Sequence, residues 1–205
     1  AIKGIEQVWL EMGDKKYFEY IQRNIEQFVE PDGNIRTYEL RDYNLDQINT
    51  GNVDGLKLAW QHTPGQQKRG IQSFPLAVDG IVYYTNTSGS VWALNGATGA
   101  PIWHYQAKID QERAEGTFYN PYNRGVAIGH GMVFMGTTDG RMIALDKNDG
   151  SVVWDNEIMS VAKGNKGFTG APLVVKDMVL IGANGGELSG CCGPIFAVDA
   201  NSGEV

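Results

Sequence analysis

Residues 93–103 read ALNGATGAPIW, and the same phrase returns as ALDKNDGSVVW at residues 144–154 and as AVDANSGEV at residues 197–205. The second copy begins 51 residues after the first, and the third begins 53 residues after the second. Self-similarity at a period near 50 residues indicates stacked supersecondary units, here β-propeller blades. Because a propeller closes only with several blades, we expect this chain to be part of a larger molecule.

A β-hairpin is predicted before each copy of the phrase. Pairs of apolar runs flank three turns, which are Asp79-Gly80, His130-Gly131 and Lys176-Asp177. Such two-residue turns need residues that tolerate positive φ. A second turn in each unit is centred on Gly99, Gly150 or Gly203, so each unit supplies four short strands. Trp103 and Trp154 end their phrases, and we expect them to be large apolar anchors between neighbouring sheets. The repeat therefore predicts antiparallel β structure over residues 71–205.

Composition excludes several functional classes. Glycine accounts for 27 of the 205 residues, which is roughly twice its average usage of about 7% and suits many tight turns. The net charge of −7 argues against a nucleic-acid partner, which requires a basic patch. No apolar run approaches the ~18 residues of a membrane span, and no signal peptide is visible. The histidines His62, His104 and His130 have no metal-ligand spacing, so each is expected to be a surface or turn residue.

The first part of the chain follows a different pattern. Between residues 2 and 29 the apolar residues recur at intervals of three and four, which is helical periodicity. Gly13 and Asp14 interrupt this run, and Asp14 can cap a second helix. We therefore predict a short α-helical hairpin in a segment 1–49, followed by propeller blades in residues 50–205.

Residues 4–18, 32–38 and 42–49 resemble the unsaturated glycuronyl (rhamnogalacturonyl) hydrolases, which are α/α-barrel enzymes. This resemblance implies a general acid or base in the Asn44-Leu45-Asp46 segment, at Asp46. A single carboxylate is not the pair that such chemistry normally needs.

From about Leu45 onward the chain resembles another family, the pyrroloquinoline-quinone (PQQ) dependent alcohol dehydrogenases. The similar stretches begin with LDQINTGNV at residues 45–53 and LKLAW at residues 56–60, and they continue to residue 205. The resemblance implies a mainly β fold, with about three blades of an eight-bladed β-propeller. Residues 45–49 fit both families, so we interpret the sequence as a chimera, natural or artificial, or as a sequence error.

The quinoprotein resemblance implies contacts to the quinone. Gln72 matches a polar contact to the quinone carboxylates, Arg124 matches an arginine near the quinone carbonyl oxygens, and Thr169 matches a hydroxyl donor. The alternatives are an exposed loop glutamine, a surface salt bridge and an ordinary turn threonine. A guanidinium fork suits planar pairs of oxygen atoms.

The same resemblance places a metal ligand after the third hairpin. Asn184, Gly185 and Gly186 match the stretch that passes beside the quinone plane, and Glu187 matches the glutamate that binds Ca2+ or a lanthanide ion. Glycines allow the backbone to approach a flat ring, and a carboxylate is a hard ligand for a hard cation. The alternative for Glu187 is a solvated loop carboxylate.

Cys191 and Cys192 are adjacent and are the only cysteines in the chain. The resembled family has a vicinal disulfide against the quinone, but at the corresponding position this chain has Phe118-Tyr119. We expect Cys191 and Cys192 to form a vicinal disulfide in an oxidising compartment, the periplasm. The alternative is two free thiols.

The resemblance thus predicts hydride transfer from a small alcohol to PQQ, with Ca2+ or a lanthanide ion as second cofactor and a cytochrome c as electron acceptor. The catalytic base and further metal ligands would come from other blades, so we expect no turnover by this chain alone. A carbohydrate hydrolase and a non-enzymatic propeller scaffold are the alternatives.

Overall fold

The computed structural model describes residues 53–65, 70–87, 89–110, 112, 114, 122–159, 167–184 and 193–205. The chain divides into two compact units, residues 1–57 and residues 58–205. In the first unit the described part includes a 3-10 turn, η2 (Val53–Gly55). The predicted helical hairpin of residues 2–29 and the predicted boundary near residue 49 lie outside the described residues. The three sheets lie in the second unit.

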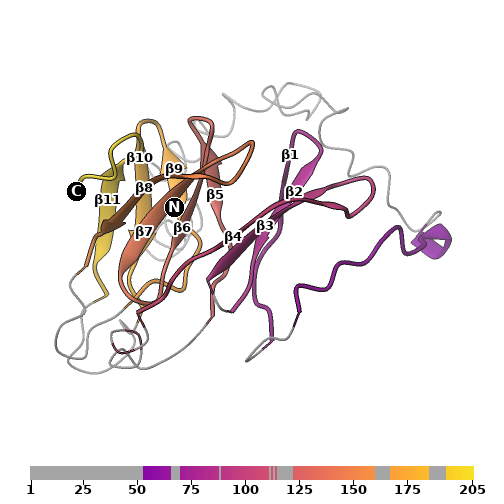
Figure 1. The fold of residues 1–205 in the computed structure, drawn as a ribbon, viewed down its shortest axis with the longest axis horizontal. Helices are drawn as coiled ribbons and strands as arrows, with labels where there is room; N and C mark the ends of the chain where they lie inside the picture. The colour runs from indigo at the N-terminus through magenta and orange to yellow at the C-terminus, as the bar shows by residue number, and fades with distance from the viewer. Residues whose placement is uncertain are drawn as a thin grey trace, which may run out of the picture. The chain divides into compact units, whose positions relative to one another are not determined.

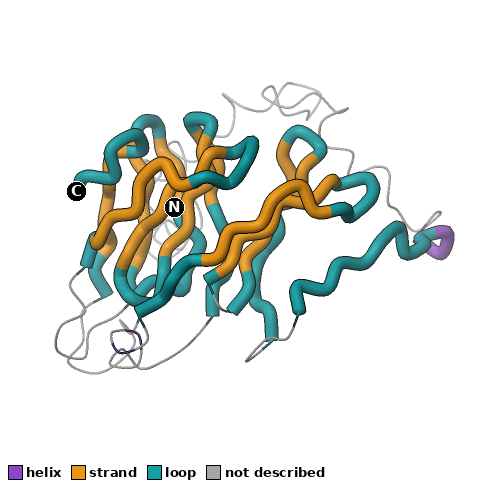
Figure 2. Tube along the Cα trace, viewed as in Figure 1, coloured by secondary structure: helices purple, strands orange, loops and turns teal. Residues whose placement is uncertain are grey.

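Three antiparallel sheets follow one another along the chain (Figures 1 and 2). The first contains β1 (Leu76–Val78), β2 (Ile81–Thr85), β3 (Ser90–Asn95) and β4 (Pro101–Gln106), in that order. The second contains β5 (Ala127–Gly129), β6 (Met132–Gly136), β7 (Arg141–Asp146) and β8 (Val152–Glu157), again in order. The third contains β9 (Leu173–Val175), β10 (Met178–Gly182) and β11 (Ile195–Asp199). The mainly β fold, built of consecutive propeller blades, is thereby confirmed.

The first hairpin of every sheet turns where the sequence predicted it. Asp79, His130 and Lys176 have φ angles of 52°, 53° and 54°, and they are the non-glycine residues with positive φ in the described part of the chain. This left-handed conformation is the one that two-residue hairpin turns require, because its twist matches that of the strands.

The tryptophans of the first two phrases each dock on a turn of the next sheet. The indole Nε1 of Trp103 donates to the carbonyl of Lys147 over 3.0 Å, and that of Trp154 donates to Ala200 over 3.0 Å. The rings lie against Gly150 and Gly203, where a Cβ atom would approach them to 2.6 and 2.7 Å. The prediction that Trp103 and Trp154 occupy equivalent anchoring positions is confirmed.

Trp60 makes the same contact on the first sheet, although it lies before the repeat begins. Its Nε1 donates to the carbonyl of Gly96 over 2.8 Å, and its ring covers Gly99. The residues before the first sheet therefore supply the same kind of anchor as β4 and β8.

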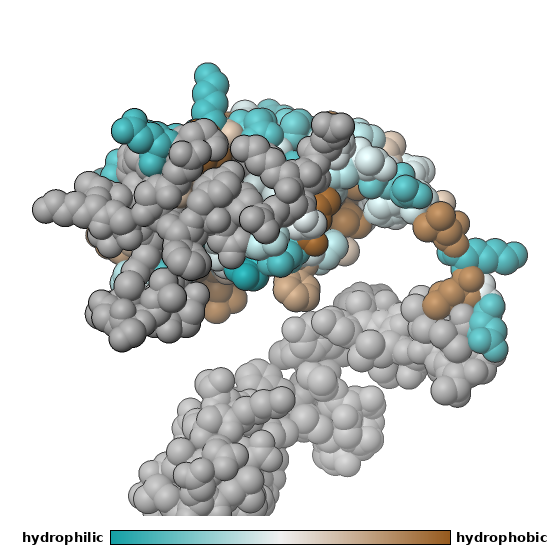
Figure 3. Space-filling model, turned by 90° about the horizontal axis from the view of Figure 1, so that it is seen from below, coloured by the Kyte–Doolittle hydropathy of each residue, from teal (hydrophilic) through white to brown (hydrophobic). Residues whose placement is uncertain are grey.

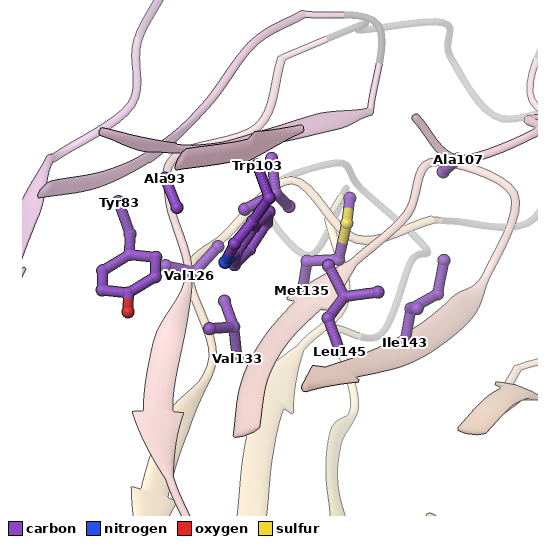
Figure 4. Packing of buried hydrophobic residues seen from close by; sticks show 10 residues of the cluster. Tyr83, Ala93, Trp103, Ala107, Val126, Val133, Met135, Ile143 and Leu145 are labelled. Atoms are coloured by element: carbon purple, nitrogen blue, oxygen red, sulfur yellow. The ribbon is translucent and has the colours of Figure 1, made fainter. Parts of the chain in front are cut away.

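The core lies between the sheets. One apolar cluster joins Tyr83, Val91 and Trp103 of the first sheet to Val133 and Ile143 of the second (Figure 4). A second cluster joins the opposite face of the second sheet to the third; its members include Phe134, Met142, Ala144, Trp154, Val179, Ile181 and Val198. Alternate residues of β6 thus face different neighbours, as strand geometry requires. This face-to-face stacking of blades is what a propeller needs.

The third sheet also presents large hydrophobic side chains to solvent. Leu173 is 62% exposed, Met178 is 45% exposed and Ile195 is 73% exposed. Figure 3 shows hydrophobic residues, coloured brown, among hydrophilic ones on the face in view.

A glycine pair tests the docking of the tryptophan. Gly131 and Gly150 have nearly equal φ angles of 72° and 74°, but a Cβ atom at Gly131 would meet nothing within 4 Å, whereas one at Gly150 would meet the ring of Trp103 at 2.6 Å. We expect Gly131→Ala to cost about 1–2 kcal/mol from backbone strain alone. Gly150→Ala should cost about 1–3 kcal/mol more, because the ring must move. Urea denaturation of both variants measures the difference, and equal losses would show that Trp103 does not press on Gly150.

An aromatic ladder crosses the first sheet. Tyr84, Trp92 and His104 are cross-strand neighbours on β2, β3 and β4. The imidazole of His104 stacks on Trp92 with ring centroids 3.9 Å apart, and His62 Nδ1 lies 2.7 Å from the hydroxyl of Tyr84. Burial raises the pKa of Tyr84 to about 12. His130 is a turn residue as expected, but the fold brings His62 and His104 to the same indole, which their spacing did not indicate.

The free energy of unfolding should depend on pH through the ionisation of His104. Burial, and secondarily the neighbouring His62, lower the pKa of His104 below its ordinary value. The folded state therefore disfavours the charged imidazole, so the stabilising contribution is complete above the unfolded pKa of about 6.5 and is lost as the pH falls through the lower folded pKa. We expect urea midpoints measured between about pH 7 and 5 to fall less steeply for His104→Gln than for the natural protein. Parallel curves would contradict this assignment.

Candidate functional site

Three equivalent segments lead into the first strands of the three sheets. Gln72 lies four residues before β1, Asn123 four residues before β5, and Thr169 four residues before β9. Arg124 follows Asn123 directly. Gln72, Asn123 and Thr169 therefore hold corresponding places in successive blades, and Arg124 lies one residue further along its segment.

Backbone hydrogen bonds join these segments to one another. The N–H of Phe74 donates to the carbonyl of Arg124 over 2.9 Å, and the N–H of Arg124 donates to the carbonyl of Thr169 over 2.9 Å. Side chains add a further link, because Arg124 Nη1 donates to the hydroxyl of Thr169 over 2.8 Å. The structure therefore brings Arg124 and Thr169 together, while Gln72 lies two residues from Phe74 and is exposed.

Asn123 supports the backbone next to this pair. Nothing in the sequence indicated a role for it. The side chain is 5% exposed; its Nδ2 donates to the carbonyl of Gly136 over 2.8 Å, and its Oδ1 accepts the N–H of Gly125 over 3.0 Å. The hydroxyl of Thr85 in the first sheet donates to the Asn123 carbonyl over 3.3 Å. Because buried polar groups are costly unless they are hydrogen-bonded, these contacts fix the backbone on either side of Arg124.

Gly125 completes the segment for a steric reason. Its φ of 135° is unfavourable for other residues, and a Cβ atom here would lie 3.0 Å from the carbonyl oxygen of Phe74. The Asn-Arg-Gly sequence is therefore a structural unit as well as a source of a guanidinium group.

Asn184 is hydrogen-bonded to the segment that precedes Thr169. It lies two residues after β10, is partly exposed, and its backbone N–H donates to the carbonyl of Gly167 over 3.1 Å. Other predicted site residues lie outside the described residues: Asp46, Gly185, Gly186, Glu187, Cys191 and Cys192, together with Phe118 and Tyr119.

The donor set has a definite chemical preference. Arg124 is always cationic and presents planar N–H donors, Thr169 supplies a hydroxyl group, and Asn184 supplies an amide. Such a set fits a flat, anionic ligand that carries carboxylates and carbonyl oxygens, and so it fits a quinone tricarboxylate. Within the part of the chain that the structure describes, no three His, Cys, Asp or Glu side chains are grouped to hold a metal ion. The predicted metal ligand Glu187 lies outside this part of the chain.

Comparison with known proteins agrees with this chemistry. The sequence profile of the PQQ β-propeller domain of glucose, ethanol and alcohol dehydrogenases matches residues 36–205. The chain belongs to this family. The matched range includes Asn123, Arg124, Thr169 and Asn184. It also includes residues 36–38 and 42–49, which resemble the glycuronyl hydrolases. The hydrolase resemblance stays a prediction.

Individual members of the PQQ family are similar over most of the chain. The quinohemoprotein alcohol dehydrogenase of Comamonas testosteroni is 42% identical over 166 residues, which are 81% of this chain and 23% of the relative. A crystal structure of the enzyme of that name and source superposes with a TM-score of 0.71 over 78% of this chain and 24% of the other. A europium-containing methanol dehydrogenase has 40% identity and a TM-score of 0.69, over 77% of this chain and 27% of the other.

The chain spans about a quarter of the length of the curated relatives it matches. The match covers 23% of the Comamonas testosteroni enzyme and 24% of the alcohol dehydrogenase (quinone) dehydrogenase subunit of Komagataeibacter europaeus. Within the residues that the structure describes, no helix has the length and apolar character needed to cross a bilayer.

Proposed function

We propose that this chain supplies three consecutive blades of a PQQ- and metal-dependent alcohol dehydrogenase. The observation that carries the proposal is the Arg124–Thr169 hydrogen bond, which joins adjacent blades and links two residues that the sequence predicts as quinone contacts. The match of residues 36–205 to the PQQ domain supports it. When bound, PQQ supplies an electrophilic quinone carbonyl that accepts hydride from an alcohol. The alternative of a non-enzymatic scaffold offers no reason for a guanidinium group held by a buried threonine at this point.

Each of these residues would contribute a different interaction with the quinone or the metal ion. Arg124 would orient the quinone by its planar N–H donors, Thr169 would hold the guanidinium and offer its hydroxyl group, and Gln72 and Asn184 would add polar contacts at the rim. Gly185 and Gly186 would let the backbone approach the ring, and Glu187 would bind Ca2+ or a lanthanide ion. A cation at this place raises the electrophilicity of the carbonyl as a Lewis acid.

We further propose that the complete enzyme has eight blades and that its catalytic base and remaining metal ligands lie on blades outside this chain. The exposed hydrophobic side chains of the third sheet support this, since Leu173, Met178 and Ile195 suit the face of a following blade. These three blades alone would supply too few catalytic and metal-binding groups to oxidise an alcohol. The proposed division of the chain is a segment 1–49 and a propeller part 50–205.

Dye-linked oxidation of small alcohols tests the function directly. The complete enzyme, stripped of cofactors and reconstituted with PQQ and either Ca2+ or La3+, should reduce the dye only when quinone and metal are both present. We propose a small alcohol as substrate and a cytochrome c as the natural electron acceptor, which reduction of added cytochrome c would support. Alcohol oxidation that persists without PQQ would refute the proposal.

The resemblance of residues 1–49 to the glycuronyl hydrolases supports a second proposal. In this case a hydrolase-like segment is fused to a quinoprotein, and the sequence is a chimera. Asp46, the acid or base of that alternative, falls inside the range that the PQQ family matches. We therefore give the quinoprotein function precedence over the carbohydrate hydrolase.

A periplasmic location, which we propose for the enzyme, has a consequence for the two cysteines. If the enzyme works in the periplasm, Cys191 and Cys192 should be joined in a vicinal disulfide, because oxidising compartments favour disulfides. Thiol titration of the denatured, unreduced protein should then detect no free thiol, and reduction beforehand should expose both. Two reactive thiols per chain before reduction would rule out the disulfide.

A further inference from the structure

The loop between β6 and β7 contains a buried carboxylate that the proposed quinone contacts do not use. Asp139 is 2% exposed. Its Oδ1 accepts the hydroxyl of Thr137, while its Oδ2 accepts the backbone N–H of Asp110 over 2.9 Å and the Nε of Arg141 over 3.1 Å. A buried charge is tolerated only when it is paired and hydrogen-bonded, as this one is.

Arg141 extends the network to the connection that follows the first sheet. Its Nη2 lies 3.1 Å from Asp139 Oδ2 and donates to the carbonyl of Lys108 over 2.7 Å. Its Nη1 donates to Asp155 on β8, whose side chain is 29% exposed. Asp139 and Arg141 therefore fasten residues 108–110 to the β6–β7 loop.

The same loop contacts both segments that form the candidate site. The carbonyl of Thr137 accepts the N–H of Phe168 over 2.9 Å, and Phe168 precedes Thr169. The carbonyl of Gly136, at the end of β6, accepts the side-chain amide of Asn123, which precedes Arg124. The loop closes on itself through the Thr137 hydroxyl, which accepts the N–H of Arg141 over 3.0 Å. The segments carrying Arg124 and Thr169 are thus hydrogen-bonded to one short stretch whose conformation Asp139 fixes.

We propose that Asp139 is a positioning residue, which holds the β6–β7 loop in the shape that keeps Arg124 and Thr169 together. The part of the proposal that concerns quinone affinity rests on the proposed function. Asp139 acts through Thr137, Asp110 and Arg141 and touches neither Arg124 nor Thr169 in the contacts described. Removal of its charge should loosen the pair without removing any group that contacts the quinone.

Hydrogen exchange of the complete protein, freed of quinone, tests the positioning, and a PQQ titration of the same samples tests its consequence. Asp139→Asn keeps the shape and removes the charge. The matched control is Asp155→Asn, which removes the exposed carboxylate on the other side of the same guanidinium. In Asp139→Asn we expect the amides of Asp110, Phe168 and Arg124 to exchange at least about tenfold faster, and the PQQ Kd to rise about tenfold or more, as for other supporting contacts of a site. Asp155→Asn should change neither.

Other results would overturn the proposal. Unchanged exchange at the Arg124 amide in Asp139→Asn, or equal effects of the two variants, would show that Asp139 does not position the pair. Faster exchange with an unchanged PQQ Kd would show that its positioning has no bearing on the quinone. Should the natural protein bind no PQQ, the proposed function fails, and the Arg124 amide still decides the positioning. If Asp139→Asn does not fold, Thr137→Val carries the same test in milder form, with Thr137→Ser as the variant that retains the hydroxyl group.

Discussion

Replacing Glu187 with Gln should lower both the metal affinity and the alcohol oxidation of the complete enzyme by tenfold or more. The substitution removes one negative charge and nearly preserves the shape, and hard cations depend on the charge of their ligands. Oxidation should fall with metal occupancy, because the cation makes the quinone carbonyl electrophilic. Losses of tenfold or more are common when contacts that support a metal site are removed.

The measurement is dye-linked alcohol oxidation against added Ca2+ or La3+. Glu204→Gln is the matched control, because Glu204 lies exposed in the turn after β11 and its loss removes the same charge from the same protein. If Glu187→Gln retains the natural rate and the natural metal dependence, Glu187 is not a ligand.

Trp103→Ala should lower the free energy of unfolding by about 3–5 kcal/mol, the usual cost of truncating a large aromatic side chain in a core. Trp103 is 8% exposed, packs between the first two sheets and donates a hydrogen bond to Lys147. Truncation would therefore leave a cavity between the blades and an unpaired carbonyl group.

Ile102 provides the control, because it is the neighbouring residue on β4 and is 46% exposed. Ile102→Ala should cost much less than Trp103→Ala in the same denaturation experiment. Equal losses for the two variants would mean that the sheets are not held together through Trp103.

The repeat was sufficient to predict the blades, because apolar runs and turn residues recur together in each copy and a terminal tryptophan recurs in the first two. Asp79, His130 and Lys176 could be placed in left-handed turns from their position between apolar runs alone. The repeat does not predict the role of Trp60, because no copy of the repeated phrase ends at this residue. Its hydrogen bond to Gly96 is nevertheless equivalent to those of Trp103 and Trp154.

The candidate site was predictable only where the resemblance supplied a residue. Arg124 and Thr169 lie 45 positions apart, and their hydrogen bond follows from the stacking of neighbouring blades. Asn123 and Asp139 gave no signal of their own, because a polar residue in a loop is usually exposed, and only tertiary packing shows that these two are buried and fully paired. Their partners come from distant segments, and no local pattern records such contacts.

The central claim is that these blades belong to a protein that holds PQQ and a metal ion. Acid extraction of the native protein, with mass spectrometry of the released organic cofactor and elemental analysis of the metal, tests this most directly. We predict stoichiometric PQQ together with Ca2+ or a lanthanide ion in the native protein. A native protein that releases no PQQ, and that binds none when PQQ and the metals are supplied, would contradict the account.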